Sequence, residues 1–182
     1  MNGPELLDLI KYRQSDRAYL PNPIEIEKLE RILEAARAAP SACNSQPWKF
    51  IVVDQEDLKN KIADCTSSKV LGLNHFTKQA PVHIVIIEEK ASFTVSAGSL
   101  IKKKTFPLID IGITAEHICL QATAEGLGTC MLGWFNEPKV KKLLNIPKSR
   151  RVPLIITLGY PASETRDKRR KNMNDIVSYN SY

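Results

Sequence analysis

The sequence predicts a single domain of the α+β or mixed α/β class, and two observations lead to this prediction. Two helix-like stretches come first, strands interleaved with helices follow, and a long polar tail ends the chain. The 182 residues contain no internal repeat and no low-complexity linker, so one domain, residues 1–182, can bury its apolar surface without disulfides. The regular βαβ rhythm of a Rossmann fold is absent, and neither GxGxxG nor GxxxxGK[ST] occurs.

Helical periodicity is clearest over residues 25–39, where apolar residues such as Ile26 and Leu29 recur at steps of three and four. A helix before it has an apolar face at residues 6–10 and ends near residues 12–16. Shorter helices are expected over residues 55–64 and 137–144, and residues 67–79 are expected to be partly helical. Residues 91–105 show no clear period and are expected to form a mobile loop.

The stretch from Ile109 to Ala124 is a helix of a different kind, because apolar or small residues lie nearly all round it. A helix of that type is buried on more than one side, which in a small chain indicates a subunit interface. Gly126 and Gly128 are expected to end it.

Strands are expected over residues 48–53, 83–87, 129–134 and 152–159. The second is an almost unbroken β-branched run, which predicts a strand covered on both faces.

The formal net charge of +6 is concentrated in two clusters, residues 102–104 and 168–171. The first is typical of a solvated loop, whereas the second can bind a phosphate, bind nucleic acid or merely be solvated. No apolar run is long enough to cross a bilayer, and the first residues lack the features of a signal peptide, so a cytoplasmic protein is expected. The four cysteines are scattered and do not indicate structural zinc.

Three separated segments can carry chemistry. Arg13-Gln14-Ser15-Asp16-Arg17 offers donors for an anion, although taken alone it is most simply a charged helix end. Residues 40–48, Pro-Ser-Ala-Cys-Asn-Ser-Gln-Pro-Trp, stop a helix and leave backbone and amide groups free for a ligand, or form a plain connector. The basic residues 168–171 are the third segment. The three histidines are expected to be structural, because each falls in a predicted helix or strand.

These segments together resemble the nitroreductase family of FMN-dependent oxidoreductases. Residues 13–17 are similar to its Arg-(Arg/His)-Ser-x-(Arg/Lys) motif, and residues 40–48 match Pro-Ser-x-x-Asn-x-Gln-Pro-Trp at every named position. Residues 110–128 resemble its central dimer helix with the closing Gly-Leu-Gly, and residues 168–177 resemble its basic tail. The resemblance implies a three-layer fold with a mainly antiparallel central sheet flanked by helices. It also implies a homodimer in which the C-terminal tails are exchanged.

The resemblance also implies how the chain would bind FMN. Residues from both ends of the chain would hold the phosphate and ribityl part: Arg13, Ser15, Lys168 and Arg170. Arg17 and Gln14 would lie towards the pyrimidine edge of the flavin, where a cation stabilises the negative charge of the reduced ring. Gln14 replaces the commoner Arg or His. The tail has Asn-Met where the family often has Pro-Leu, so Lys168 and Arg169 are alternatives for one contact.

Other contacts are implied from the middle of the chain and from the partner subunit. Backbone groups of Leu132 and Gly133 would lie near flavin N5, and Asn74 would make a further flavin contact. Four residues of the second motif would reach the flavin of the other subunit: Pro40, Ser41, Ala42 and Asn44.

The implied activity is transfer of hydride equivalents from NAD(P)H to a small nitroaromatic or quinone-like acceptor by a ping-pong mechanism. A flavin-binding sensor or carrier on the same fold, without NAD(P)H turnover, is the alternative. A nucleic-acid-binding module is disfavoured because the basic clusters lack interleaved aromatic residues and any known nucleic-acid motif.

Overall fold

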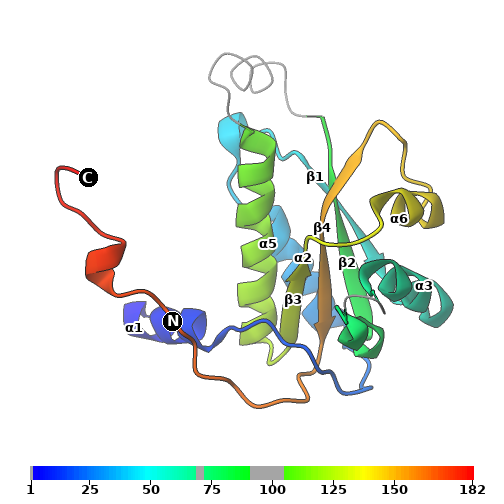
Figure 1. The fold of residues 1–182 in the computed structure, drawn as a ribbon, viewed down its shortest axis with the longest axis horizontal. Coiled ribbons are helices and arrows are strands. Elements are labelled where there is room, and N and C mark those ends of the chain that lie inside the picture. Colours follow the sequence, from blue (N-terminus) through cyan, green and yellow to red (C-terminus); the bar gives the residue numbers. More distant parts are fainter. Residues whose placement is uncertain (1, 69–71, 91–104) are drawn as a thin grey trace.

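The computed structural model describes residues 2–68, 72–90 and 105–182, and these form three layers (Figure 1). A four-stranded sheet lies in the middle, with α2 (Ile26–Arg37) and α5 (Phe106–Ala124) on one face. The other face carries α3 (Glu56–Thr66) and α6 (Glu137–Leu143). The α+β class and the antiparallel central sheet flanked by helices are therefore confirmed.

The sheet has the strand order β1-β2-β4-β3, and each neighbouring pair is antiparallel. Its strands are β1 (Trp48–Val53), β2 (Val82–Glu88), β3 (Gly128–Leu132) and β4 (Arg151–Gly159). The strand expected over residues 48–53 has those bounds, and the others differ from expectation by one or two residues. Because β3 is an edge strand, its outer side is open to another segment or a ligand.

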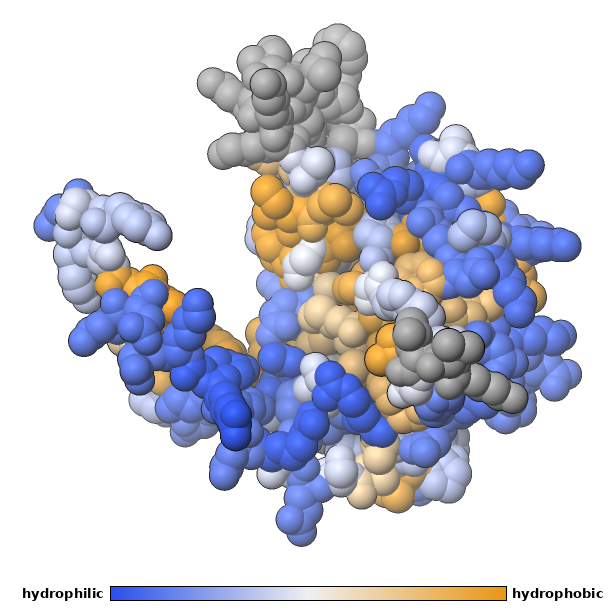
Figure 2. All heavy atoms as spheres, viewed as in Figure 1, coloured by the Kyte–Doolittle hydropathy of each residue, from blue (hydrophilic) through white to orange (hydrophobic). Residues whose placement is uncertain are grey.

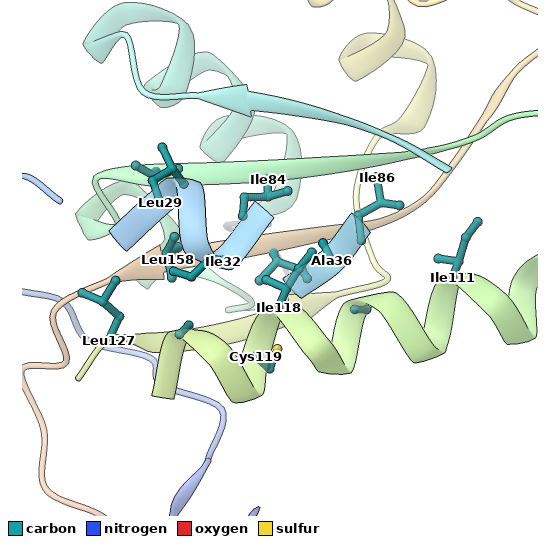
Figure 3. Packing of buried hydrophobic residues seen from close by; sticks show 14 residues of the cluster. Leu29, Ile32, Ala36, Ile84, Ile86, Ile111, Ile118, Cys119, Leu127 and Leu158 are labelled. Atoms are coloured by element: carbon teal, nitrogen blue, oxygen red, sulfur yellow. The ribbon is translucent and has the colours of Figure 1, made fainter. Parts of the chain in front are cut away.

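The larger core lies between the sheet and the helices α2 and α5 (Figure 3). Alternate side chains of β2, such as Ile84 and Ile86, point towards Ile32 of α2 and Ile118 of α5, and all four are fully buried. The intervening Val85 belongs to the second core, under α3 and α6. The β-branched run of β2 is thus covered on both faces, as its sequence predicts.

Helix α1 (Gly3–Tyr12) forms where expected, but its apolar face is not buried within the chain. Pro4 in the first turn and a capping box between Asn2 and Glu5 begin the helix. None of its residues is buried, and Leu6, Leu7 and Ile10 are exposed. Local capping and amphipathicity therefore specify this helix, while its apolar face remains uncovered in the single chain.

Helix α5 is longer than the expected 109–124 and is covered on one side only in the single chain. Ile111, Ala115 and Ile118 are buried, whereas Ile109 is 53% exposed. Figure 2 shows apolar residues over the amino-terminal half of this helix on the outer surface. Gly126, with φ of +75°, follows the helix in the left-handed conformation that glycine adopts readily. Burial of α5 on more than one side is therefore not observed within one chain.

Three short 3₁₀ helices complete the described elements: η1 (Ala42–Asn44), η2 (His75–Gln79) and η3 (Met173–Asp175). η2 accounts for the partly helical character expected of residues 67–79. The loop expected over residues 91–105 and the lysine cluster at 102–104 lie outside the described residues, apart from Thr105. In the described part of the chain, no helix is long and apolar enough to cross a membrane.

The C-terminal tail leaves the body of the domain after β4 and passes α1 (Figure 1). From residue 162 onwards every residue except Lys168 is exposed. The tail thus joins the sheet to the outer side of α1 without adding to either core.

Candidate functional site

Residues 13–17 lie beside the edge strand β3. Ser15 forms a parallel bridge with Thr129, and the Asp16 N–H donates to the Thr129 carbonyl at 2.8 Å. Tyr19 anchors the segment: its hydroxyl donates to the Asp16 carbonyl at 3.0 Å and lies 2.7 Å from the Thr157 hydroxyl of β4. The first motif is therefore fixed against the sheet and is more than a charged helix end.

Gly128 allows the close approach of this segment to β3. A Cβ atom at residue 128 would lie 2.6 Å from Oδ2 of Asp16, so any larger side chain would push Asp16 away. Asp16 is buried, and this burial raises the pKa of its carboxyl. Gln14 opposes that rise by donating to Asp16 Oδ1 at 2.8 Å. The glycine expected only as a helix stop thus also makes room for the site.

The C-terminal tail returns to the same segment through Gln14. Its side-chain oxygen accepts from the Arg166 N–H at 3.0 Å, and its amide nitrogen also reaches the Glu164 carbonyl at 3.3 Å. The Arg166 guanidinium donates to the Ser15 carbonyl at 2.7 Å. Gln14 therefore ties the two ends of the chain together, a role the sequence did not indicate.

A polar pocket of about 250 Å³ lies between the first motif and the tail. Its walls include Ser15, Gln14, the carboxylate of Asp167 and five cationic residues: Arg13, Arg17, Arg166, Lys168 and Arg170. All six residues that were expected to contact the ligand from the two ends of the chain line this one pocket.

The cations of the pocket are crowded together. Partial burial, followed by the charges of Arg13 and Arg170, lowers the pKa of Lys168 below its ordinary value. The Lys168 ammonium donates to the Lys11 carbonyl, and Arg13 Nε lies 3.2 Å from Glu116 Oε1. Neutral acceptors and the carboxylates of Glu116 and Asp167 only partly offset the charge of five cations, so the pocket suits an anion with several oxygen atoms.

The second motif forms a tight loop that is not beside this pocket. η1 lies at the amino-terminal end of α5, whereas α1 lies beside its carboxyl-terminal half (Figure 1). Cys43, Asn44 and Gln46 all have positive φ, between 44° and 51°, which is costly for residues other than glycine. Pro40, Cys43, Asn44 and Gln46 are exposed. Within one chain the loop and the cationic pocket are therefore separate.

The strained loop is held by hydrogen bonds along its own length. Gln46 N–H donates to the Ser41 hydroxyl at 2.9 Å, and the Gln46 amide donates to Asn44 Oδ1 at 3.0 Å. The Ala42 N–H donates to Oδ1 of buried Asp110 at 3.1 Å, which attaches the loop to α5. Such a preformed loop presents its exposed residues in a fixed arrangement.

Leu132 and Gly133 lie at the far end of β3 from the Ser15 bridge. Leu132 is buried against β4, and Gly133 is exposed just after the strand. The Thr129 carbonyl points away from β4 towards Asp16, and backbone groups of every second residue point the same way. We therefore expect the backbone of Met131, and of Gly133 if the strand geometry continues, to face the open edge.

Asn74 lies elsewhere, between α3 and η2. Its side-chain amide donates to the Thr66 carbonyl at 3.1 Å, and its backbone is left-handed with φ of 55°. It thereby caps the last carbonyl of α3 and directly precedes η2, and it does not line the cationic pocket. Residues 69–71 before it lie outside the described chain.

Two site residues were not found from the sequence. Arg166 lies two residues before the basic run and belongs to no motif, so nothing in the sequence marks it as a site residue. Asp110 was included only as the start of the central helix, although a buried acid beside the second motif is a common way to hold a loop N–H. Both act through backbone groups of distant segments, which a single sequence does not reveal.

The histidines do not enter the pocket. His83 is fully buried in β2, and His117 Nδ1 lies 3.2 Å from the Ala35 carbonyl at the α2–α5 contact. What the site offers is therefore an anion-binding end at Ser15 and an open strand edge leading to Gly133. A ligand with an anionic group and a flat polar body suits these two features.

Fold and pocket together define an α+β domain with an anion-accepting site at its sheet edge. The nitroreductase family model matches residues 10–160, and the chain belongs to the nitroreductase family. A solved FMN-dependent nitroreductase from Clostridium difficile R20291 is 31% identical, with a TM-score of 0.77, over 97% of this chain and 99% of that one.

Two curated relatives show that the similarity extends to different reactions. An oxygen-insensitive NADPH nitroreductase of Helicobacter pylori is 28% identical over 181 residues, which cover 84% of this chain and 85% of the relative. Rat iodotyrosine deiodinase 1 is 27% identical over 203 residues, covering 97% and 70% respectively. Family membership therefore does not by itself define the electron acceptor.

Proposed function

We propose that this chain is an FMN-dependent oxidoreductase that passes two electrons from NAD(P)H to a small organic acceptor, as a homodimer with shared flavin sites. The observation that carries the proposal is the pocket in which both ends of the chain place five cations and Ser15 at the edge of β3. Family membership and the FMN-dependent relative support FMN as the occupant.

The donors present fit the phosphate of FMN. A phosphate monoester carries nearly two negative charges and three acceptor oxygens, and arginine pairs hold such groups with charge-assisted hydrogen bonds. Burial, and then the charges of Arg13 and Arg170, lowers the pKa of Lys168, and an anion among these three residues would offset the repulsion between their charges. The proposal adds Arg166 to these contacts. It also explains the basic tail without nucleic acid.

The remaining flavin contacts would come from the β3 edge and a second chain. The Gly133 backbone would meet the ring, whereas the Leu132 backbone faces β4, and Arg17 would favour negative charge at the pyrimidine edge of the ring. The loop residues Pro40, Ser41, Ala42 and Asn44 would complete the site from the partner. Asn74 would contribute from the α3–η2 connection.

The uncovered apolar faces support the dimer. Helix α1 has no buried residue, and exposed apolar side chains also lie on α5 and the tail, among them Ile109 and Ile176. Contiguous exposed apolar surface marks an interaction site. In this proposal the tail crosses to the partner, and a cytoplasmic location is retained as a prediction.

Bound FMN would supply two-electron redox chemistry between NAD(P)H and the acceptor, with protons exchanged with solvent. The protein would bind the phosphate, orient the ring along β3 and exclude water from one face. Among the described residues, no atom outside the two chain neighbours lies within 4 Å of the place that a Cβ would take at Gly133, and no general acid of this chain is assigned.

The test is an anaerobic titration of the purified protein with NADH and, separately, NADPH. We expect a yellow protein whose flavin absorbance bleaches with one equivalent of reductant per site and returns with p-benzoquinone or nitrofurazone. A protein that cannot be loaded with FMN would contradict the proposal. Bound FMN without bleaching by either nucleotide would favour the sensor or carrier alternative.

A further inference from the structure

A second pocket, of about 400 Å³, lies beyond the end of β3, on the α3–α6 side of the molecule. The end of α3 and the turn after Gly133 form its walls, with Cys65 and Ser67 facing Trp134 and Asn136. Its volume is in the range of small-molecule sites. None of the expected flavin contacts lines it, so it is distinct from the cationic pocket at the other end of the strand.

The walls of this pocket are fixed to one another. The Asn136 N–H donates to the Cys65 carbonyl at 2.9 Å, and Asn136 Oδ1 accepts from the Lys139 N–H at 3.1 Å. The Cys65 thiol is buried and donates to the Lys61 carbonyl at 3.2 Å. The turn that carries Trp134 is therefore attached to α3 by a backbone hydrogen bond that does not depend on the tryptophan side chain.

Trp134 gives the pocket an aromatic surface. Its side chain is 48% exposed, although it directly follows Gly133 in a turn held against the core. A half-exposed indole face beside a cavity favours stacking with a flat, electron-poor ring.

The charge of the pocket is positive on the side of Lys139. The Asp64 carboxylate also lines the pocket, but its Oδ1 lies 2.7 Å from the Lys78 ammonium. In the described part of the chain, no carboxylate lies within ion-pair distance of Lys139. One cation thus remains available to a ligand.

We propose that this pocket selects the electron acceptor: it binds planar aromatic acceptors that carry an anionic substituent, with the ring on Trp134 and the anion at Lys139. The inference rests on the proposed function, because Gly133, the expected neighbour of the flavin ring, immediately precedes Trp134. It deepens that function by naming a substrate class and two specificity-determining residues.

Binding can be measured apart from turnover, because the chain has only two tryptophans. In a Trp48→Phe protein, 4-nitrobenzoate should quench Trp134 fluorescence saturably, whereas the matched Trp134→Phe protein should show no saturable quenching. Lys139→Ala should weaken 4-nitrobenzoate about threefold to fivefold and leave neutral nitrobenzene unchanged. Lys142→Ala, on the same helix outside the pocket, is the control. Equal affinity for 4-nitrobenzoate and cationic N-methyl-4-nitropyridinium would overturn the proposal.

Kinetics then separate this inference from the proposed function. Trp134→Leu should raise the KM for 4-nitrobenzoate about fivefold, and flavin reduction by NAD(P)H is followed separately in the same variant. An unchanged KM with normal flavin reduction would overturn the pocket but leave the oxidoreductase intact. Loss of flavin reduction in the unmodified protein would instead contradict the oxidoreductase, while fluorescence would still report on the pocket.

Discussion

The interior of the sheet and the two ends of the chain differ in how far their side chains are buried. Ile84, Ile118 and Ile156 are fully buried between layers of the same chain. By contrast, α1 has no buried residue and almost all of the tail is exposed. The first region is complete within one chain, whereas the second combines uncovered apolar faces with crowded cations. The difference indicates that the fold is specified by the core, whereas under the proposed function the ends of the chain depend on a ligand and a partner.

The largest expected effect tests whether the cationic pocket at the ends of the chain binds the FMN phosphate. The double variant Arg13→Ala, Arg170→Ala removes two charge-assisted contacts, each worth roughly 1.5–3 kcal/mol, so FMN affinity should fall by roughly 10²–10⁴-fold. Flavin fluorescence in an equilibrium titration measures the change. Arg37→Ala, Lys142→Ala alters the net charge equally outside the pocket and should retain FMN. Undiminished affinity in the first variant would show that the cationic pocket is not the phosphate site.

The second prediction compares two isoleucines of α5. Ile118→Ala opens a cavity in the core and should lower the free energy of unfolding by about 2–5 kcal/mol. Ile109→Ala changes a side chain that is 53% exposed and should cost the isolated chain less than about 1 kcal/mol. It should nevertheless raise the dissociation constant of the dimer. Urea unfolding measures the change in stability, and sedimentation at several concentrations measures the change in dimer dissociation. An equal loss of stability in both variants would contradict the distinction between the buried and the exposed face of α5.

The third prediction concerns His83, the polar group enclosed in the core. Burial, and then the charge of Lys59, lowers the pKa of His83 to about 4 from an ordinary value of 6.5. The unfolded chain therefore binds a proton in this interval that the folded chain excludes. The stability given by the neutral ring is complete above pH 6.5 and is lost as the pH falls towards 4, by about 3 kcal/mol in total.

Urea unfolding between pH 4 and pH 7 measures this dependence. His83→Phe should flatten the curve in that interval, whereas His75→Phe, in η2, should leave it unchanged. A slope that persists in His83→Phe would assign the acid sensitivity to other groups.

The sequence predicted the positions of helices and strands better than it predicted what packs against them. Periodicity located α2 and β1 closely, because apolar spacing depends on the core that each element contacts. The same pattern could not show that the apolar face of α1 would remain uncovered, since burial depends on what lies opposite.

For the candidate site, too, the motifs could be predicted from the sequence, but the contacts between them could not. The motif at residues 13–17 and the basic run were expected to meet, and the structure brings them into one pocket. The contacts that bring them together involve Gln14 with the Arg166 backbone and Gly128 with Asp16. Neither contact can be recognised from the spacing of residues in the sequence, because one uses a backbone N–H and the other depends on the absence of a side chain.

The smallest predicted effect tests whether the tail is held in place by Gln14. Gln14→Leu removes its bonds to Asp16 and to the backbone of residues 164 and 166, and a hydrogen bond of this kind is worth about 0.5–1.5 kcal/mol. Global stability should change little, because neither core is touched. Limited trypsin cleavage after Arg166, followed by mass spectrometry, should become roughly two- to tenfold faster. Gln55→Leu, at the start of α3, should not alter it. If cleavage in Gln14→Leu matches the parent chain, the tail is held by its cations and their ligand rather than by this amide.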